Sequence, residues 1–325
     1  MKITKKIKRD LKQIRAIIYL QNKYIELFKW YLASYNKFLL VLSPALFLKH
    51  RYNSIFNRKI NLINPELFSE KLVWLNLYWL HPLKIQCADK YAMRSYVEKQ
   101  GWGHLLPEIL GVYENSSEID FSLLPEKFVL KCTHGSAFNI ICENKSLLDL
   151  DDTHYKLNTW MKKDYSKVAG ELHYSFMKPL IICEKFLDDF VNELPVDFKV
   201  YCFNGKAICT LVALDRNKKG HTEKFDIYNL DWTTKLPYIE SSLKTDRFTQ
   251  KPDAYEEMIE AAEALSKPFP FVRMDFYNIR GKAVLGEMTF TPAGCMYKGY
   301  TETAERDLGA LITLPTRLPY SSTIS

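Results

Sequence analysis

Two strand-like runs near the end of the chain constrain its fold most strongly. In FVRMDFY, residues 271–277, and VLGEMTF, residues 284–290, apolar and polar side chains alternate with the period of a β-strand. Only the six residues NIRGKA separate the runs, which predicts an antiparallel hairpin. Each run contains an acid, Asp275 or Glu287, and a buried acid is costly unless a cation or hydrogen-bond donor compensates it. The two acids therefore suggest a shared partner.

The register of this hairpin decides whether the two acids can share that partner. Alternation places Arg273 with Asp275 on one face of the first run, and Leu285, Glu287 and Thr289 on one face of the second. Pairing of odd-numbered with odd-numbered positions puts both acids on the same face, whereas a slip of one residue separates them. We predict the first register. Mg²⁺ prefers one or two carboxylates beside phosphate oxygens, and the alternative interpretation is a solvated strand face.

The remaining sequence predicts helices mixed with mainly antiparallel strands. Strand-like runs are PEILGVY, KFVLK, IICEN, PLIICEKFL and VDFKVYCFNGKAICTLVAL, the last turning at Asn204-Gly205. Helices are expected over residues 64–80 with Asn64 as N-cap, from the N-cap Asp89 to the stop signal Gly101, over 149–165 and over 253–266. This mixture is typical of an α+β protein.

The first 60 residues carry the excess positive charge. They hold 14 Lys and Arg residues but only Asp10 and Glu26, a local charge of +12 in a chain of net charge +7, so the remainder is net acidic. Residues 1–20 form a basic amphipathic pattern, with apolar side chains at helical spacing (Ile3, Ile7, Leu11, Ile14 and Ile18). Such a helix lies on an anionic membrane surface or packs on the protein body, and both interpretations stay open.

Several classes of protein are disfavoured. Residues 38–48, FLLVLSPALFL, are too few to span a bilayer and contain Pro44, and no small-residue cleavage site indicates a signal peptide. Seven cysteines without a C-x-x-C pair indicate reduced, buried thiols in a cytoplasmic protein. The seven histidines form no H-x-x-x-H array, which disfavours zinc, and the acidic remainder disfavours nucleic acid.

Two lysines and one strand end are candidates for nucleotide contacts. Lys131 ends an apolar strand and precedes the small-residue loop CTHGSAFN, whose backbone N–H groups could approach a phosphate closely. Lys90, in the first turn of its expected helix, would oppose the helix dipole unless an anion lay nearby. The run IICEKFL could present backbone groups to an adenine edge. No G-x-x-x-x-G-K-[ST] motif is present, and solvated surface lysines are the alternative.

In chain order, Lys90, Lys131 with its loop, EKFL, DFK, RMD and GEMTFTPAG resemble the ATP-grasp superfamily, and most closely its TupA-like branch, associated with teichuronopeptide and surface polysaccharide biosynthesis. FSEKLVWLNLY, ADKYAMRSYV and KCTHGSAFN extend the match to about residues 64–311. The resemblance implies an ATP-grasp fold, with the nucleotide held between two α+β subdomains that contain antiparallel sheets. The expected parts are a basic helical segment (1–60), the N-terminal part of the ATP-grasp domain (61–126), a central lid subdomain (127–187) and a C-terminal subdomain with the metal site (188–325).

The resemblance also implies roles for individual residues. Those that would contact ATP are Lys90 and Lys131 at the phosphates, Ser136 in a lid over residues 136–139, Glu184, Lys185 and Leu187 around adenine, Asp197 at the ribose hydroxyls and Lys199 facing phosphate. Asp275 and Glu287 would bind Mg²⁺, and Arg273 would meet the reacting carboxyl group.

Three positions depart from the family pattern. Thr289 stands where the superfamily often has Asn in E-x-N, which leaves the third metal ligand undefined. Ala137 and Cys295 occupy positions where Gly would be usual, in the lid and near the acceptor pocket.

The function that the resemblance implies is an ATP-dependent carboxylate–amine ligase that works through an acylphosphate and needs no protein nucleophile. Its expected substrates are a uronic acid of a capsular or other surface polysaccharide precursor, free or lipid-linked, and an amino acid or amine. The expected location is the cytoplasm, with possible peripheral contact at the inner face of the membrane. Alternatives are a glycosyltransferase using DLDD (149–152), which also reads as a helix N-cap, a kinase, and a non-catalytic nucleotide-binding assembly protein.

Overall fold

The computed structural model describes residues 18–27, 34–35, 38–187, 196–214, 224–245 and 247–318. The chain divides into two compact units, Met1–Arg51 and Tyr52–Ser325. In the first unit, residues 18–27 are helical. Helix α2 (Pro44–Phe56) also begins in the first unit. Most of the basic amphipathic helix expected over residues 1–20 lies outside the described residues. No helix in the described ranges is long and apolar enough to cross a membrane.

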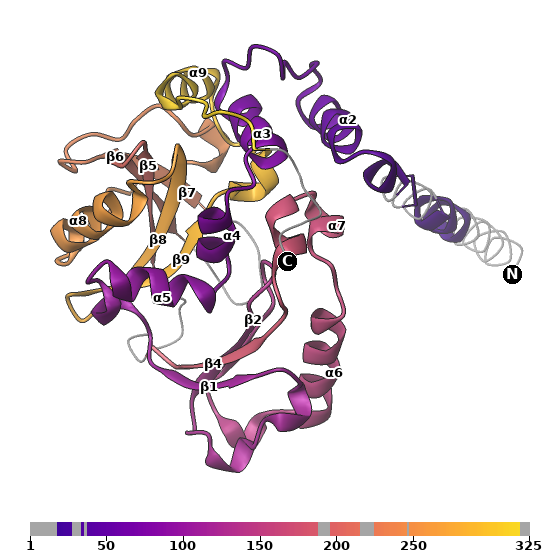
Figure 1. The fold of residues 1–325 in the computed structure, drawn as a ribbon, viewed down its shortest axis with the longest axis vertical. Coiled ribbons are helices and arrows are strands. Elements are labelled where there is room, and N and C mark those ends of the chain that lie inside the picture. The colour runs from indigo at the N-terminus through magenta and orange to yellow at the C-terminus, as the bar shows by residue number, and fades with distance from the viewer. Residues whose placement is uncertain are drawn as a thin grey trace, which may run out of the picture. The chain divides into compact units, whose positions relative to one another are not determined.

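The second unit contains two antiparallel sheets (Figure 1). The first has the strand order β1-β4-β2-β3, with β1 at Ile109–Tyr113, β2 at Phe128–Cys132, β3 at Asn139–Cys142 and β4 at Ile181–Lys185. Helix α6 (Leu150–Met161) contributes Leu157 to the buried core under this sheet, which also includes Phe128, Leu130, Ile181 and Cys183. The alternating residues Val129 and Lys131 of β2 are only half-buried.

The second sheet has the order β7-β6-β5-β8-β9. Its strands are β5 (Asp197–Phe203), β6 (Lys206–Leu214), β7 (Lys224–Asn229), β8 (Phe271–Ile279) and β9 (Lys282–Thr289). Helix α8 (Tyr255–Ser266) contacts β5, β6, β8 and β9. On β8, Val272, Met274 and Phe276 are fully buried, so the opposite face carries the polar residues Arg273 and Asp275.

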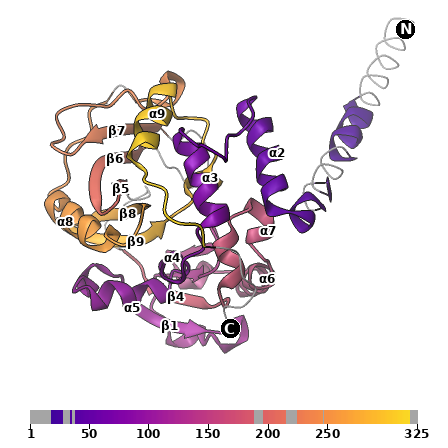
Figure 2. The same ribbon diagram turned by 45° about the horizontal axis from the view of Figure 1, so that its top comes forward.

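The other helices are α3 (Phe68–Tyr78), α4 (Pro82–Ala88), α5 (Ala92–Lys99), α7 (Ser166–Ala169) and α9 (Glu302–Leu311). Helix α9 lies beside α3 (Figure 2). Of the short 3₁₀ segments, η5 (Leu172–Phe176) precedes β4 and η7 (Pro292–Cys295) follows β9 in the sequence.

The α+β class with antiparallel sheets is confirmed, as are the β5–β6 turn at Asn204-Gly205, with φ angles of 49° and 82°, and the end of α5 before Gly101. The expectation of reduced, buried cysteines is also confirmed, because all seven are buried free thiols.

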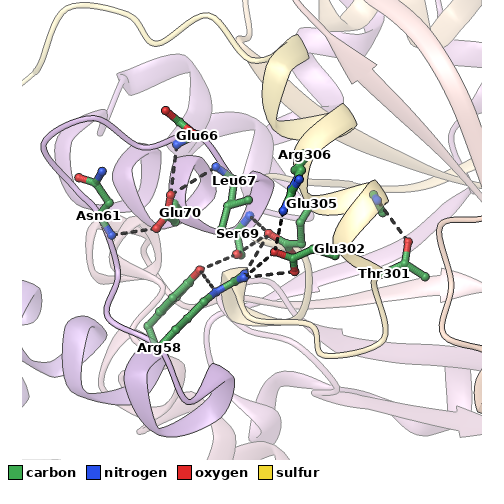
Figure 3. A network of polar contacts seen from close by, with 12 residues as sticks. Arg58, Asn61, Glu66, Leu67, Ser69, Glu70, Thr301, Glu302, Glu305 and Arg306 are labelled. Carbon is green, nitrogen blue, oxygen red and sulfur yellow. Dashed lines mark hydrogen bonds and ion pairs between the residues drawn. The ribbon is translucent and has the colours of Figure 1, made fainter.

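The predicted start of α3 is wrong, whereas the capping role of Asp89 before α5 is confirmed. Helix α3 begins after Leu67 and not after Asn64, because the carboxylate of Glu70 accepts the N–H groups of Glu66 and Leu67 at this end (Figure 3). Asp89 accepts the N–H groups of Tyr91 and Ala92, two and three residues later, at 2.8 Å each, as the predicted N-cap would. The regular helix α5 begins only at Ala92. Lys90 directly follows this capping residue and lies two residues before Ala92.

Candidate functional site

Asp275 and Glu287 lie directly opposite each other on β8 and β9. The register pairs Arg273 with Thr289, Met274 with Met288 and Asp275 with Glu287. Both acids therefore project from the same face of the sheet, as predicted. Asp275 is buried, whereas the Glu287 side chain is 41% exposed.

A β-bulge at Gly286 produces this pairing. Phe276 lies opposite Leu285, so an unbroken ladder would place Asp275 opposite Gly286 and turn Glu287 to the other face. The extra residue shifts the register by one, and the prediction that Leu285 shares a face with Glu287 is therefore wrong. Gly286 also suits the close packing here, because a Cβ atom at this position would lie 2.9 Å from the Tyr277 ring.

Cations from neighbouring positions surround Asp275. Arg273 Nε and Nη2 each donate to the carboxylate at 2.6 Å, and Lys199 Nζ of the adjacent strand β5 donates at 2.7 Å. Lys199 also bonds Asp197 two residues earlier on the same face. The sheet thus brings together five of the predicted residues: Asp197, Lys199, Arg273, Asp275 and Glu287.

These contacts determine the ionisation of the cluster. Burial by itself would raise the pKa of Asp275, but the positive charges of Arg273 and Lys199 outweigh burial and hold the pKa below its usual value. Burial likewise tends to lower the pKa of Lys199, yet Asp275 and Asp197 raise it above the ordinary lysine value. Asp275 is consequently a carboxylate and Lys199 an ammonium ion near neutral pH.

The two acids fit a hard divalent cation in kind and position. Carboxylate oxygens are the donors that Mg²⁺ prefers, and two of them face one another across adjacent strands. Thr289 donates to Glu287 Oε1 at 3.0 Å and so orients this carboxylate. Arg273 Nη2 lies 3.9 Å from the same oxygen. Asp275 thus has two close cationic partners, Arg273 and Lys199, whereas Glu287 stays partly exposed.

A second group of predicted residues lies on the four-stranded sheet. Lys131 Nζ on β2 bonds Glu184 Oε2 on the neighbouring strand β4 at 2.5 Å, and Glu184 is buried. Lys185 is exposed and pairs with Glu108 at 2.8 Å, and the half-buried Leu187 follows β4. The contact of Lys131 with Glu184 joins a residue expected at phosphate to one expected beside adenine.

Lys90 lies at the base of the small-residue loop. Its ammonium group donates to the carbonyl of Gly135 at 2.5 Å, and its backbone N–H approaches the Thr133 carbonyl at 3.5 Å. Ser136 and Ala137 are exposed at the tip of the loop. Phe138, however, is buried in the core of the four-stranded sheet, with its ring stacked on Trp160 at a centroid distance of 5.4 Å. The loop is therefore anchored at Phe138.

Tyr174 on η5 is a buried tyrosine that the sequence did not single out. Burial raises the pKa of Tyr174, and the carboxylates of Glu171, Glu287 and Asp89 add to that effect. Its ring contacts those of Tyr165 and His173, at centroid distances of 5.1 Å and 4.3 Å. Nothing in its local sequence, LHYSF, distinguishes it from a core tyrosine, so only the fold reveals this position.

Two residues that depart from the expected family pattern have positive φ angles. Ala137 and Cys295 adopt φ angles of 59° and 69°, in the left-handed region where Gly is most readily accommodated. The acids of DLDD serve a helix instead: Asp149 is the N-cap of α6 and accepts the N–H of Asp152 at 2.9 Å. The interpretation of this run as an N-cap is confirmed.

A groove of about 700 Å³ lies between the start of α3 and α9, where Figure 3 shows an ionic network. Its lining includes Glu66, Glu70, Lys71, Glu302 and Arg306 and none of the predicted site residues. We assign it no part in the site.

The family model described as TupA-like ATP-grasp matches residues 70–313. The chain belongs to the TupA-like ATP-grasp family, and its fold is the ATP-grasp fold. No curated protein matches the chain.

Solved structures with a similar fold include D-alanine–D-alanine ligase from Bacillus anthracis (16% identity, 70% of this chain and 65% of that chain, TM-score 0.40) and from Helicobacter pylori (13% identity, 76% and 69%, TM-score 0.41). A third is the ATP-grasp ligase PsnB complexed with minimal precursor (13% identity, 70% and 60%, TM-score 0.38). This chain spans less than two thirds of the Bacillus anthracis ligase and of PsnB.

Proposed function

We propose that the protein is an ATP-dependent carboxylate–amine ligase that uses Mg²⁺. The observation that carries the proposal is the cluster on β5, β8 and β9, in which two opposed carboxylates lie beside the cations Arg273 and Lys199. Membership of the ATP-grasp family supports ATP as one substrate. The cluster provides what phosphoryl transfer needs from a protein, namely positioning and neutralisation of charge.

The reaction has two steps. A carboxylate oxygen of the acceptor attacks the γ-phosphorus of ATP, and the bond from that phosphorus to the β–γ bridging oxygen breaks to release ADP. The nitrogen of the amine then attacks the acyl carbon of the acylphosphate, loses a proton to solvent, and inorganic phosphate leaves. An amide results, and no protein group becomes covalently attached.

The roles of the chain's own cations in these steps follow the family resemblance. Lys131 and Lys90 hold the phosphates, and Lys199 faces them from β5. Arg273 stabilises the oxyanion that develops on the acyl group when the amine attacks. Asp275 and Glu287 would hold Mg²⁺, which when bound offsets negative charge on the triphosphate.

The adenosine part of ATP is assigned to the four-stranded sheet and to Asp197. Glu184, Lys185 and Leu187 border the adenine, and Asp197 accepts hydrogen bonds from the ribose hydroxyls. Ser136 at the exposed tip of the loop covers the phosphates and limits access of water to the acylphosphate.

For the acceptor we propose a uronic acid of a capsular or other surface polysaccharide precursor, and for the amine an amino acid or a small amine. Support comes from the association of the TupA-like branch with teichuronopeptide and surface polysaccharide biosynthesis. A precursor carried on a lipid would place the reaction at the inner face of the cell membrane.

The test combines purified protein with ATP, Mg²⁺ and panels of uronic acids and amines, with phosphorus species followed by ³¹P NMR. We expect ADP and phosphate in equal amounts only when an acid and an amine are both present. A phosphorylated product without amide would indicate a kinase, and UDP or GDP from a nucleotide sugar would indicate a glycosyltransferase. No ADP with any pair would overturn the proposal. Glu287→Gln is expected to abolish turnover, whereas Glu114→Gln, at an exposed surface carboxylate, is the control.

A further inference from the structure

The first unit exposes an apolar stripe on one side of a helix. Residues 38–42 are helical, and the bonds from Ser43 N to Leu39 O and from Phe47 N to Ser43 O carry the helical path across Pro44 into α2. The spacing i, i+3, i+4, i+8 places Phe38, Val41, Leu42 and Leu46 on one face. Their exposed fractions are 62%, 73%, 61% and 47%. We call these four residues the apolar stripe.

The stripe is too extensive to be an ordinary scatter of surface residues. Leu40, Phe47 and Leu48 of the same segment are buried, so the helix has one packed side and one exposed side that are both apolar. In the helical residues 18–27, Ile18, Leu20, Ile25 and Leu27 are exposed as well. Large apolar side chains gathered in an exposed position indicate an interaction site.

The net charge of the first unit indicates the chemistry of a partner for the apolar stripe. Residues 1–51 contain 12 Lys and Arg residues against Asp10 and Glu26, a net +10, which leaves −3 for residues 52–325 because the chain totals +7. Lys49, one helical turn beyond Leu46, is itself exposed. A partner must therefore accept apolar side chains and present negative charge beside them.

We propose that the apolar stripe docks on the surface of an anionic lipid bilayer. The four side chains enter the boundary between headgroups and acyl chains, and Lys49 and other cationic side chains of the first unit interact with lipid phosphates. A second copy of this chain would bring like charge against like charge, since each first unit carries +10. An anionic lipid surface supplies both the apolar phase and the opposite charge. The inference stands apart from the ligase proposal.

The test is flotation of the full-length protein with vesicles of phosphatidylcholine alone or with about one third phosphatidylglycerol. We expect binding to the anionic vesicles, at least about tenfold weaker binding to the neutral ones, and a similar loss when NaCl rises from about 0.05 to 0.5 M, because added salt screens exposed charges.

The deciding variant is Val41→Glu/Leu42→Glu, which places two charges in the stripe. Its matched control is Leu123→Glu/Leu147→Glu, which adds the same charge at two 81% exposed leucines of the second unit. We expect the stripe variant to bind anionic vesicles at least about tenfold more weakly than the native chain and the control to stay within about twofold. Thermal unfolding of both variants shows whether each is folded, and folding is expected because all four positions are exposed.

Three outcomes would overturn the inference. One is equal binding of the stripe variant and its control, and another is no binding to either vesicle. The third is that the native protein binds no vesicles and is a dimer by light scattering, whereas the stripe variant is a monomer. This result would identify a second copy of the chain as the partner. ADP release in the absence of vesicles is expected to be the same in the stripe variant and the native protein, so loss of docking and loss of ligase activity are observed separately.

Discussion

Among the proposed site residues, Asp275 is a buried carboxylate that depends on its neighbours for charge compensation. Its carboxylate is buried and both neighbouring cations, Arg273 and Lys199, are mostly buried too. Each of these three groups would be costly to bury alone, and together they compensate one another. The same side chain thus serves folding and the proposed chemistry.

Replacing this residue tests both roles. Asp275→Asn leaves Arg273 and Lys199 without their shared carboxylate, so we expect about 3–5 kcal/mol lower free energy of unfolding. ADP release is expected to fall at least about a hundredfold. Urea unfolding and the ³¹P assay measure the two effects, with Glu114→Gln as the control. Unchanged stability would show that the contacts of Asp275 contribute little.

Lys84 allows a prediction about pH. It is fully buried, donates to the carbonyls of Leu75 and Trp79, and burial lowers its pKa to about 8. The unfolded chain has a lysine pKa near 10.4. Between these two values the unfolded state binds more protons, so the contribution of Lys84 to stability rises with pH from about 8 to 10.4.

Comparison with Lys84→Met isolates this effect from the tyrosines and cysteines that titrate in the same range. The difference in free energy of unfolding between native protein and variant is expected to grow in favour of the native protein by about 2–3 kcal/mol from pH 8 to 10.4. Denaturant unfolding at a series of pH values measures it. A difference that does not change with pH would mean that the pKa of Lys84 is normal.

At the scale of elements, the hairpin β8–β9 depends on the bulge at Gly286. A Cβ atom there would lie 2.9 Å from Tyr277 Cε2 and 3.3 Å from the Asp275 carbonyl oxygen. We therefore expect Gly286→Ala to lower the free energy of unfolding by about 1–3 kcal/mol. In a double-mutant cycle, Tyr277→Ala removes the nearest ring, and the cost of Gly286→Ala should then decrease by at least about half. Additive effects would exclude a clash with this ring.

The loop before β3 is a second element with a testable anchor. Phe138 packs on Trp160 and on Tyr165, with ring centroids 5.4 Å apart in both pairs. Phe138→Ala is expected to release the loop, so that water reaches the acylphosphate and more ADP forms per amide. The ratio of the two products measures this coupling. A ratio that remains at one would show that the anchor is not needed.

The hairpin also shows how far the sequence could predict the structure. Alternation along each run identified both strands, and Asn204-Gly205 identified another turn because its residues tolerate positive φ. The alternating pattern could not reveal the extra residue at the bulge. A bulge changes the face of every later side chain, and its only signal in this sequence is one Gly. The start of α3 was missed because Glu70, inside the helix, accepts the backbone N–H groups before it, a contact that the sequence pattern does not indicate.

Within the site, the residues on one strand face were easier to predict than those that meet through the fold. Lys199, Arg273 and Asp275 follow from spacing and from family resemblance, and the structure brings them into contact. The contact of Lys131 with Glu184 joins β2 and β4 of the four-stranded sheet and depends on long-range strand pairing that the sequence does not encode locally.

For the molecule as a whole, the seven buried cysteines report on global unfolding. Burial raises the pKa of several of them, to about 12 for Cys87, Cys132, Cys183 and Cys202, so both access and ionisation limit their reactivity. We expect fewer than about one thiol to react with a disulfide reagent in the native protein at pH 8, and all seven in denaturant. Rapid reaction of a native thiol would contradict the buried positions.

The ion pairs around Asp275 also affect when a divalent ion can arrive. Arg273 and Lys199 already balance this carboxylate, so the sheet should fold equally well after treatment with a chelator. Free Mg²⁺ would have to compete with two tethered cations and would bind weakly. Mg²⁺ would therefore bind together with the triphosphate, and the nucleotide-free protein would hold little Mg²⁺.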